Sequence, residues 1–535
     1  MKKLVFLFPL LFKLSSTYAQ APKLVVGIVV DQMRYDYLYR FYDKYSEKGF
    51  KKLLNQGTSF ENTNYNYIPT YTAPGHASIF TGATPSLHGI VGNYWYDKDN
   101  SSRKVYCVED FDVQPVGTTS KSAQRSPKNM LCTTVGDQLK LFTNGKSKVV
   151  GLSLKDRGAI LPAGHAADYA FWLDDSTGNF VTSSYYTEKL PDWVEKFNQQ
   201  KKAEELVHQK WTLLLDKSQY TESIEDNNPY EDLFGGELSP VFPHDLTKEF
   251  EQNRYAVLKS TPFGNTLLKE FALETIKNME LGKDDVPDFL SVSFSATDYV
   301  GHQFAPHSVE IEDTYLRLDR DLGDLIEYLD KKIGKENYVL FLTADHGAAE
   351  NPAYLKSMKI PAGIFYTDDM ESSLNSLCYN AEFAPSSAWN EKCVQITNHQ
   401  IYLWEVEDYD GNLNLIDPVY KLSREENILT YFFSRETPRN KLMQMAQNGY
   451  YAPRCGDFRY ILKPNYMEHD YKGTTHGSPY SYDTHVPLLW YGASVPTQKI
   501  YRRIEITDIA ITIANMLHIQ EPNCTNGQPL VEILK

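Results

Sequence analysis

Residues 23–31 read KLVVGIVVD, an apolar run that ends in a carboxylate. Two later runs also end just before polar side chains: DFLSVSFS (288–295) before Asp298, and YVLFLT (338–343) before Asp345 and His346. Short apolar runs of this kind are typical of buried strands. In a parallel α/β sheet, functional side chains gather at the carboxyl ends of the strands. The sequence therefore predicts an α/β fold with its chemistry at one edge of the sheet.

The side chains that follow these runs belong to a set of six metal-binding types. The six are Asp31, Asp298, His302, Asp345, His346 and His476. Asp298 and His302 are four residues apart, about one helical turn, so both can face one ion. Asp345 and His346 are adjacent, which a strand end or turn can aim at one site. Three Asp and three His suffice for two divalent ions.

A candidate nucleophile lies in residues 70–76, which read TYTAPGH. Pro74 suits the first turn of a helix, and this predicts Thr72 at the N-cap. Free backbone N–H groups and the helix dipole favour an anion there, so a Thr72 hydroxyl beside a metal ion can ionise and attack. The alternatives are that Thr72 is a plain capping residue or that Thr70 is the nucleophile. Thr70, two residues earlier, should fall outside the cap.

The motifs together resemble the alkaline phosphatase superfamily. In chain order they are Asp31, TYTAPGH (70–76), HGIVGNYW (88–95), SATDYVGHQFAP (295–306), TADHG (343–347) and TTHGSP (474–479). More closely, they resemble the bacterial periplasmic phosphate-irrepressible alkaline phosphatases that have a Thr nucleophile. The resemblance runs from about residue 23 to the C-terminus, and no catalytic position departs from it. It implies an alkaline-phosphatase-like fold, in which helices flank a mostly parallel central sheet, with inserted cap segments.

The resemblance also implies two zinc ions per chain. One ion would be held by Asp298, His302 and His476, and the other by Asp31, Asp345, His346 and the oxygen of Thr72. Zinc accepts imidazole nitrogens and carboxylate oxygens. We expect His76, His88, His307 and His485 to be structural or to donate hydrogen bonds to the ligands.

A Lys-x-Arg pair, Lys155 and Arg157, follows the apolar run 148–154. Taken alone, it could be a solvated basic turn. In the family, the matching residues contact the transferred phosphoryl oxygens, with Lys155 in place of a third metal ion, and Asn93 would donate to the same group. Two extra cations favour a monoester, which carries two negative charges, over a diester, which carries one. Asp156 between them points away in a strand pattern and is not assigned.

The function expected from these residues is zinc-dependent hydrolysis of phosphate monoesters through a phosphothreonine intermediate, with broad organic substrates and release of inorganic phosphate. A phosphodiesterase or nucleotide pyrophosphatase of the same superfamily is the alternative, and it should lack the Lys155/Arg157 pair. A sulfatase is disfavoured because no Cys or Ser followed by x-Pro-x-Arg occupies the nucleophile position. Thr72 and the six ligands argue against a metal-binding protein without activity.

The first 19 residues are typical of a secretory signal, with two early Lys, an apolar run and a small-residue cleavage site near Ala19. The chain is therefore expected in the periplasm or outside the cell. Removing these residues, which hold three Lys and no acid, changes the net charge from −15 to −18. So acidic a chain should not bind nucleic acid through its phosphates. No later stretch is long and apolar enough for a stable membrane span, and we expect a monomer.

Residues 20–535 are predicted to form a single catalytic domain, because its motifs run from Asp31 to His476. Two stretches, about 185–265 and 352–470, look like insertions. The C-terminal segment is predicted to add a strand at 485–491 and a helix at 506–517. The chain has six Cys, which allow up to three disulfides in an exported protein. The close spacing of Cys378 and Cys393 makes that pair the first candidate.

Overall fold

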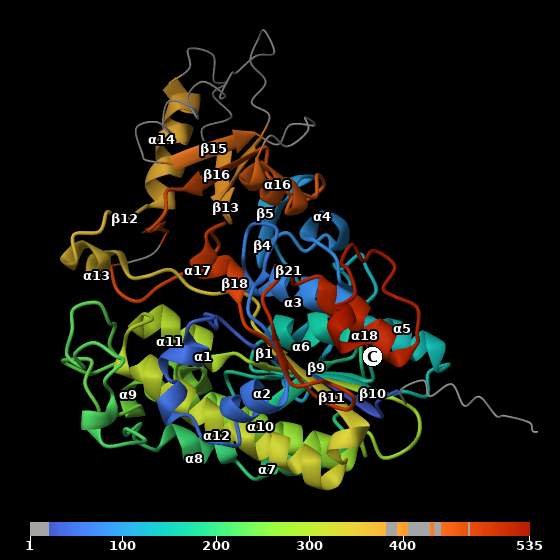
Figure 1. Cartoon of the computed structure of the whole chain (residues 1–535). Coiled ribbons are helices and arrows are strands. Elements are labelled where there is room, and N and C mark those ends of the chain that lie inside the picture. The colour runs from blue at the N-terminus through green and yellow to red at the C-terminus, as the bar shows by residue number, and fades with distance from the viewer. Residues whose placement is uncertain (1–20, 381–392, 405–427, 433–439, 469–470, 535) are drawn as a thin grey trace, which may run out of the picture.

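The computed structural model describes residues 21–380, 393–404, 428–432, 440–468 and 471–534. Its centre is a ten-stranded sheet in the order β20-β2-β19-β11-β1-β10-β7-β8-β9-β6 (Figure 1). These strands are β1 (Leu24–Val30), β2 (Thr58–Phe60), β6 (Pro115–Val116), β7 (Val149–Ser153), β8 (Tyr169–Leu173), β9 (Phe180–Ser183), β10 (Asp288–Phe294), β11 (Tyr338–Thr343), β19 (Leu488–Gly492) and β20 (Gln498–Ile500).

The middle of this sheet is parallel, and β1 lies at its centre. β1 pairs with β10 on one side and with β11 on the other, and Leu24 lies opposite both Asp288 and Tyr338. β7 and β8 continue the parallel run, whereas β19 and β9 join antiparallel. All seven residues of β1 are buried. The mostly parallel sheet is confirmed. Because β1, β10 and β11 are parallel and in register, the segments that follow them lie at the same edge of the sheet.

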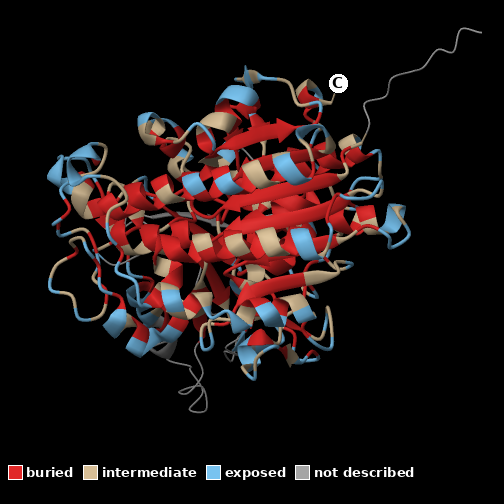
Figure 2. Cartoon of the chain, turned by 90° about the horizontal axis from the view of Figure 1, so that it is seen from below, coloured by how far each residue is buried: buried red, intermediate tan, exposed pale blue. Residues whose placement is uncertain are grey.

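Helices cover both faces of the sheet. One layer holds α3 (Thr72–Thr81), α5 (Val135–Phe142), α6 (Asp156–Ala163) and α18 (Asp508–Leu517), and the other holds α2 (Phe50–Gln56), α7 (Asp192–Gln199), α8 (Lys202–Val207), α10 (Pro262–Asn278) and α12 (Val309–Lys332). Figure 2 views the second layer from outside, where its helices carry exposed residues while the strands behind them are buried. The core therefore lies between the sheet and the inner faces of two helix layers.

The segment predicted as one strand at 485–491 is two strands. β18 (His485–Val486) pairs with β3 (Thr63–Asn64), and β19 then pairs with β11 and β2. Pro487 separates the two, because proline has no N–H to donate to a ladder. The predicted helix at 506–517 is α18, which begins two residues later, at Asp508.

A second, smaller sheet lies apart from the central one, at the top of Figure 1. Its four strands, in the order β13-β14-β16-β15, are antiparallel and all fall within residues 352–470. They are β13 (Val394–Thr397), β14 (Gln400–Leu403), β15 (Ile428–Phe432) and β16 (Phe458–Leu462), with α14 (Thr367–Asn380) and α16 (Lys441–Asn448) beside them. We call this unit the cap sheet.

The stretch 185–265 adds helices to the second layer rather than a sheet. α7 and α8 pack against α10, and the 3₁₀ helix η4 (Arg254–Ser260) packs against α10 and against α11 (Ala296–Phe304). Within the residues that the structure describes, no helix combines the length and apolar character needed to cross a membrane.

The structure contains a disulfide between Cys132 and Cys524, which are 392 residues apart. It ties the C-terminal segment to the residues just before α5. The pair expected from spacing, Cys378–Cys393, is wrong, because Cys393 is a buried free thiol; the side chain of Cys378 lies outside the described residues.

Candidate active site

The six predicted ligands meet at the carboxyl edge of the central sheet. Asp31 follows β1, Asp345 and His346 follow β11, and Asp298 and His302 lie on α11 directly after β10. His476 arrives from the C-terminal segment, in the loop before α17 (Ser481–Thr484). Five of the six are buried, and the side chain of His302 is 32% exposed. The site therefore opens to solvent beside His302.

The first predicted ligand group is brought together by one helical turn and one distant loop. Nε2 of His302 lies 3.1 Å from Oδ1 of Asp298, as their four-residue spacing on α11 predicts. Nε2 of His476 lies 3.7 Å from the same oxygen. One ligand atom from each of these three residues lies within 4.8 Å of the others, which is a suitable arrangement for one metal ion.

In the second predicted group, Asp298 also brings a ligand atom close to Asp31 and His346. Asp345 is adjacent, because its Oδ2 lies 3.6 Å from Nε2 of His346. Its other oxygen accepts a hydrogen bond from the backbone N–H of Gln32 at 3.1 Å. Asp298 thus stands between the two groups.

All three histidines are oriented in the same way. The Nδ1–H of His302, His346 and His476 donates to a backbone carbonyl, at 2.7, 2.9 and 2.7 Å respectively. This bond selects the tautomer whose Nε2 carries the lone pair, and Nε2 is the atom near the carboxylates in each case. Such backbone acceptors are the usual partners of metal-binding histidines.

The charge balance of the cluster also fits a bound cation. Burial, together with the nearby Asp31 carboxylate, raises the pKa of the Asp345 carboxyl well above its usual range. Burial lowers the pKa of His346 to about 3, so this imidazole is neutral. Within the described part of the chain, Asp31 Oδ1 and Asp345 Oδ2 are buried without a hydrogen-bond partner. A neutral imidazole and carboxylate oxygens without hydrogen-bond partners are donors that zinc takes.

Thr72 faces the second group from the start of α3. Its Oγ1 lies 3.5 Å from Nε2 of His346. The N-cap prediction is off by one: Tyr71 is the N-cap, with extended backbone angles, and Thr72 is already the first helical residue. The alternative nucleophile, Thr70, has a different partner: its hydroxyl donates a hydrogen bond to the carbonyl of Ser478 at 3.1 Å.

Asn93 lies beside Thr72 and is held on both sides. Its Oδ1 accepts from the backbone N–H of Ala73 at 3.0 Å, which leaves the amide NH₂ as a donor. Its carbonyl accepts from the N–H of Cys107 at 3.0 Å. Asn398, in the β13–β14 turn of the cap sheet, donates to the carbonyl of Tyr94. The cap sheet therefore contacts the loop that positions Asn93.

Lys155 connects the two ligand groups. Its Nζ donates to Asp31 Oδ2 at 2.7 Å and to Asp298 Oδ2 at 2.5 Å. Burial alone would lower the pKa of Lys155, but these two carboxylates outweigh it and raise the pKa. Burial would likewise raise the pKa of Asp298, but His302 and Lys155 hold it well below the usual range. The prediction placed Lys155 against a phosphoryl group; the structure adds these two carboxylate contacts.

Arg157 is held by a network that the sequence did not reveal. Its Nη1 donates to the hydroxyl of Tyr106 at 3.1 Å, and that hydroxyl donates to Asp156 Oδ1 at 2.5 Å. The second oxygen of Asp156 accepts from Arg125 Nε at 2.8 Å. Asp156, which the sequence left unassigned, thus supports Arg157 through Tyr106.

Gln32 is a further contact that the sequence analysis missed. Its Nε2 donates to Asp298 Oδ1 at 2.8 Å. Its φ of 62° turns the chain sharply after Asp31, which brings the side chain back over the site. The expectation for His76 agrees with the structure: its Nδ1 donates to the carbonyl of Thr72 at 2.8 Å and lies 3.4 Å from Asp345.

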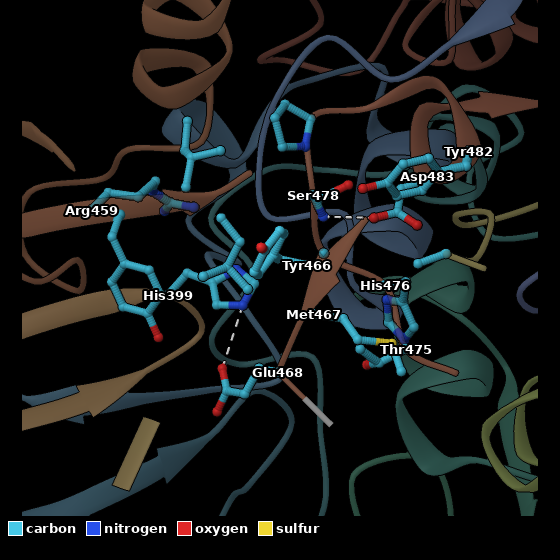
Figure 3. Close-up of a pocket in the computed structure, with 16 residues that line it drawn as sticks. His399, Arg459, Tyr466, Met467, Glu468, Thr475, His476, Ser478, Tyr482 and Asp483 are labelled. Carbon is cyan, nitrogen blue, oxygen red and sulfur yellow. Dashed lines mark hydrogen bonds and ion pairs between the residues drawn. The ribbon is translucent and has the colours of Figure 1, made fainter. Parts of the chain in front are cut away.

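A narrow pocket lies behind His476, where its loop meets the cap sheet (Figure 3). His399 and Arg459 line it from the cap sheet, and Ser478 lines it from the loop. Nε2 of His399 lies 3.4 Å from a carboxylate oxygen of Glu468. The cavity measures about 20 Å³, which is room for roughly one water molecule. It is therefore too small for a substrate and marks the contact between the His476 loop and the cap sheet.

Comparisons with known proteins agree with this geometry. Residues 25–484 match the type I phosphodiesterase / nucleotide pyrophosphatase family. The chain is 46% identical to the alkaline phosphatase PafA of Elizabethkingia meningoseptica (96% of this chain, 94% of PafA). It is 45% identical to a protein named calcium-transporting ATPase from Myroides odoratus (98% and 96%) and 44% identical to the alkaline phosphatase PhoV of Synechococcus elongatus (96% and 93%).

Solved structures give the same result. The crystal structure of PafA matches with a TM-score of 0.90 at 46% identity, covering 96% of this chain and 99% of that one. A PafA variant with a Thr replaced by Ser, and an Asn, a Lys and an Arg replaced by Ala, matches with a TM-score of 0.89 at 45% identity, over 96% and 99% of the two chains. The chain therefore belongs to the type I phosphodiesterase / nucleotide pyrophosphatase family, within the alkaline phosphatase superfamily.

Proposed function

We infer that the chain is an alkaline phosphatase, a hydrolase of phosphate monoesters that depends on bound metal. The observation that carries this inference is the meeting of Thr72 Oγ1, 3.5 Å from Nε2 of His346, with two Asp/His groups at one sheet edge. Relatives named alkaline phosphatases match nearly the whole chain at 44–46% identity. The diesterase alternative is not favoured, although the family model carries that name.

Two zinc ions are the cofactor that the donor set suits. Asp298, His302 and His476 would hold one ion, and Asp31, His346 and Asp345 would hold the other beside Thr72. When bound, such ions supply Lewis-acid charge at the attacking and leaving oxygens. Asp298 belongs to both groups and contacts Lys155, so both ions would lie near Lys155.

Thr72 is the nucleophile in this proposal. Its Oγ attacks phosphorus and forms a phosphothreonine, and the organic alcohol leaves. Water then attacks the phosphothreonine and releases inorganic phosphate, which restores the Thr72 hydroxyl. The dipole of α3 favours the developing negative charge at its N-terminus, and the N–H of Ala73 is used to orient Asn93. The hydrogen bond from the Thr70 hydroxyl to the Ser478 carbonyl supports Thr72 over Thr70 in this role.

Asn93, Lys155 and Arg157 bind the transferred phosphoryl group. The amide of Asn93 is a donor, and the two cations neutralise charge that spreads over the non-bridging oxygens. The four positions substituted in the PafA variant are spaced 21, 62 and 2 residues apart. Thr72, Asn93, Lys155 and Arg157 have the same residue types and the same spacing, which supports their joint assignment.

The rest of the chain fits an exported, broad-specificity enzyme. Residues 1–19 act as the signal peptide, cleaved near Ala19, and the mature chain works in the periplasm or outside the cell as a monomer. Residues 20–535 act as one catalytic domain, into which the stretches 185–265 and 352–470 are inserted. The Cys132–Cys524 disulfide is compatible with an oxidising compartment.

The test compares a monoester with a matched diester. The purified wild-type protein should hydrolyse 4-nitrophenyl phosphate far faster than methyl 4-nitrophenyl phosphate and should contain about two zinc ions per chain. A protein that prefers the diester would be a phosphodiesterase instead. If the zinc-loaded protein hydrolysed neither ester, the chain would be a metal-binding protein without phosphatase activity.

A further inference from the structure

A polar cavity of about 340 Å³ opens beside the phosphoryl-binding residues. Lys155 and Arg157 line it where it borders the active site, and Lys259 and the turn at Asp174–Ser176 line another part of its wall. Cavities of this size hold small molecules. The mechanism above uses Lys155 and Arg157 and leaves Lys259 without a role.

Lys259 is a buried cation with an exposed partner. It lies on η4 and is 8% exposed. Its Nζ pairs with Asp175 Oδ1 at 2.5 Å, while the Asp175 side chain is 48% exposed. Burial would lower the pKa of Lys259, but Tyr299 and Asp175 raise it, so the ammonium stays charged. Because Asp175 reaches solvent from a turn, it can yield its place to another anion.

Tyr299 links Lys259 to the active site. Its ring centroid lies 4.8 Å from Lys155 Nζ and 5.9 Å from Lys259 Nζ, so the two ammonium groups are no more than about 11 Å apart. Tyr299 also follows Asp298 directly on α11. The cavity wall therefore borders the metal group that would face the leaving oxygen, which is where the organic part of a monoester is attached.

The other acids of this cavity are held by fixed partners. Asp156 accepts from Arg125 and Tyr106, as described above. Asp174 accepts from the hydroxyls of Thr118, Ser176 and Thr177. Asp175 is thus the acid that competes with a ligand for Lys259. An incoming carboxylate or phosphate would exchange one anionic partner for another without leaving a buried charge unpaired.

We propose that this cavity is a second anion subsite, in which Lys259 binds a carboxylate or second phosphate on the organic part of the substrate. This proposal rests on the proposed phosphomonoesterase function and adds a substrate class to it. The preferred substrates would be small phosphomonoesters with a further acidic group a few bonds from the ester oxygen. A purely structural Lys259–Asp175 pair, holding the turn against η4, would give no such preference.

The test uses 3-phosphoglycerate and glycerol 3-phosphate, which differ in a carboxylate against a hydroxymethyl group. Wild type should show a higher kcat/KM for 3-phosphoglycerate. Lys259→Met should lower that value at least about tenfold, because a charge-assisted contact is lost, and should leave glycerol 3-phosphate nearly unchanged. Asp175→Asn should raise the preference for 3-phosphoglycerate, since it frees Lys259 from its competing anion.

Lys269→Met is the matched control. Lys269 is also 8% exposed and is paired with Asp321 and Asp324, but it lies on α10 away from the cavity. It should alter thermal stability without altering the ratio of the two substrates. Equal losses on both substrates in Lys259→Met, or no preference in wild type, would overturn the subsite. Failure of wild type to hydrolyse glycerol 3-phosphate at all would instead count against the phosphomonoesterase function.

Discussion

The active site and a second cluster, which includes Glu310 on α12, both bury acidic side chains beside histidine. The two sites differ in the hydrogen-bond partners of the imidazole nitrogens. At the active site, His302, His346 and His476 each donate Nδ1–H to a backbone carbonyl and turn Nε2 toward carboxylates. In the second cluster, which consists of Glu231, Glu237, His244 and Glu310, His244 contacts a carboxylate with each nitrogen, both at 3.0 Å.

This difference decides which cluster suits a metal ion. His244 is raised to a pKa of about 9, because Glu237 and Glu310 outweigh the opposite effect of burial, so it is an imidazolium without a lone pair. Burial, with Glu310 nearby, raises the pKa of Glu231 to about 10, so that carboxyl holds its proton. The second cluster thus places a cation, His244, between Glu237 and Glu310, beside a protonated carboxyl at Glu231. At the active site, Lys155 contacts only Asp31 and Asp298, and within the described residues Asp31 Oδ1 and Asp345 Oδ2 have no hydrogen-bond partner, so these oxygens are available to bound cations.

The largest expected effect is loss of turnover on metal removal. A strong chelator should remove about two zinc ions per chain and abolish hydrolysis of 4-nitrophenyl phosphate, and added zinc should restore both. The second cluster holds no ion in this account, so Glu310→Gln should retain two zinc ions per chain. Metal analysis with parallel rate measurements checks both statements; a loss of zinc in Glu310→Gln would remove the contrast between the clusters.

Substitution of one histidine in each cluster sharpens the comparison. His476→Ala should leave about one zinc per chain and reduce turnover strongly, because His476 alone brings the C-terminal segment to the first ligand group. His244→Ala should keep about two zinc ions. Equal zinc contents in the two variants, with normal activity in His476→Ala, would mean that His476 is not a ligand.

The cations beside the site should discriminate between ester classes. Lys155→Ala and Arg157→Ala should each reduce kcat/KM for a monoester much more than for a matched diester, by roughly tenfold to a hundredfold in the ratio. A monoester presents three non-bridging oxygens and two charges, and a diester presents two and one. Tyr106→Phe, which removes the acceptor of Arg157, should give a smaller change in the same direction. Equal losses of kcat/KM on both esters would mean that Lys155 and Arg157 bind both ester classes alike or support the structure, and do not select monoesters.

The smallest expected effect concerns stability and pH. A folded-state pKa of about 9 for His244, against 6.5 ordinarily, stabilises the fold fully below pH 6.5, and this contribution is lost as pH rises to about 9. It amounts to on the order of 3 kcal/mol. Chemical denaturation of His244→Gln should show a shallower decline in unfolding free energy over that interval.

The parts of the site that follow strand ends could be predicted from the sequence. The runs before Asp31, Asp298 and Asp345 are β1, β10 and β11, since continuous apolar stretches of this length have few other places in a fold. The spacing of Asp298 and His302 also predicted their contact, because a helix fixes the geometry of residues four apart. The assignment of the distant His476 to the same ion as Asp298 and His302, and the role of the Lys155/Arg157 pair, required the family resemblance.

The remaining features depend on tertiary geometry that leaves no local pattern. Gln32 reaches Asp298 only because its backbone turns through a φ of 62°. The network through Tyr106 and Asp156 joins residues about 50 positions apart. The Cys132–Cys524 disulfide spans 392 residues, and closeness in sequence favoured a different pair. Lys259 lies in an apparent insertion, where composition alone gave it no role.

The most direct test of the account is the joint measurement of zinc content and turnover in Thr72→Ala, with Thr72→Ser and Thr70→Ala beside it. Thr72→Ala should keep about two zinc ions per chain and lose at least about 10³-fold in monoester turnover, because the attacking oxygen is gone while the Asp and His donors stay. Thr72→Ser should keep substantial activity, and Thr70→Ala should keep most of it. Full activity in Thr72→Ala with an inactive Thr70→Ala would contradict the central claim.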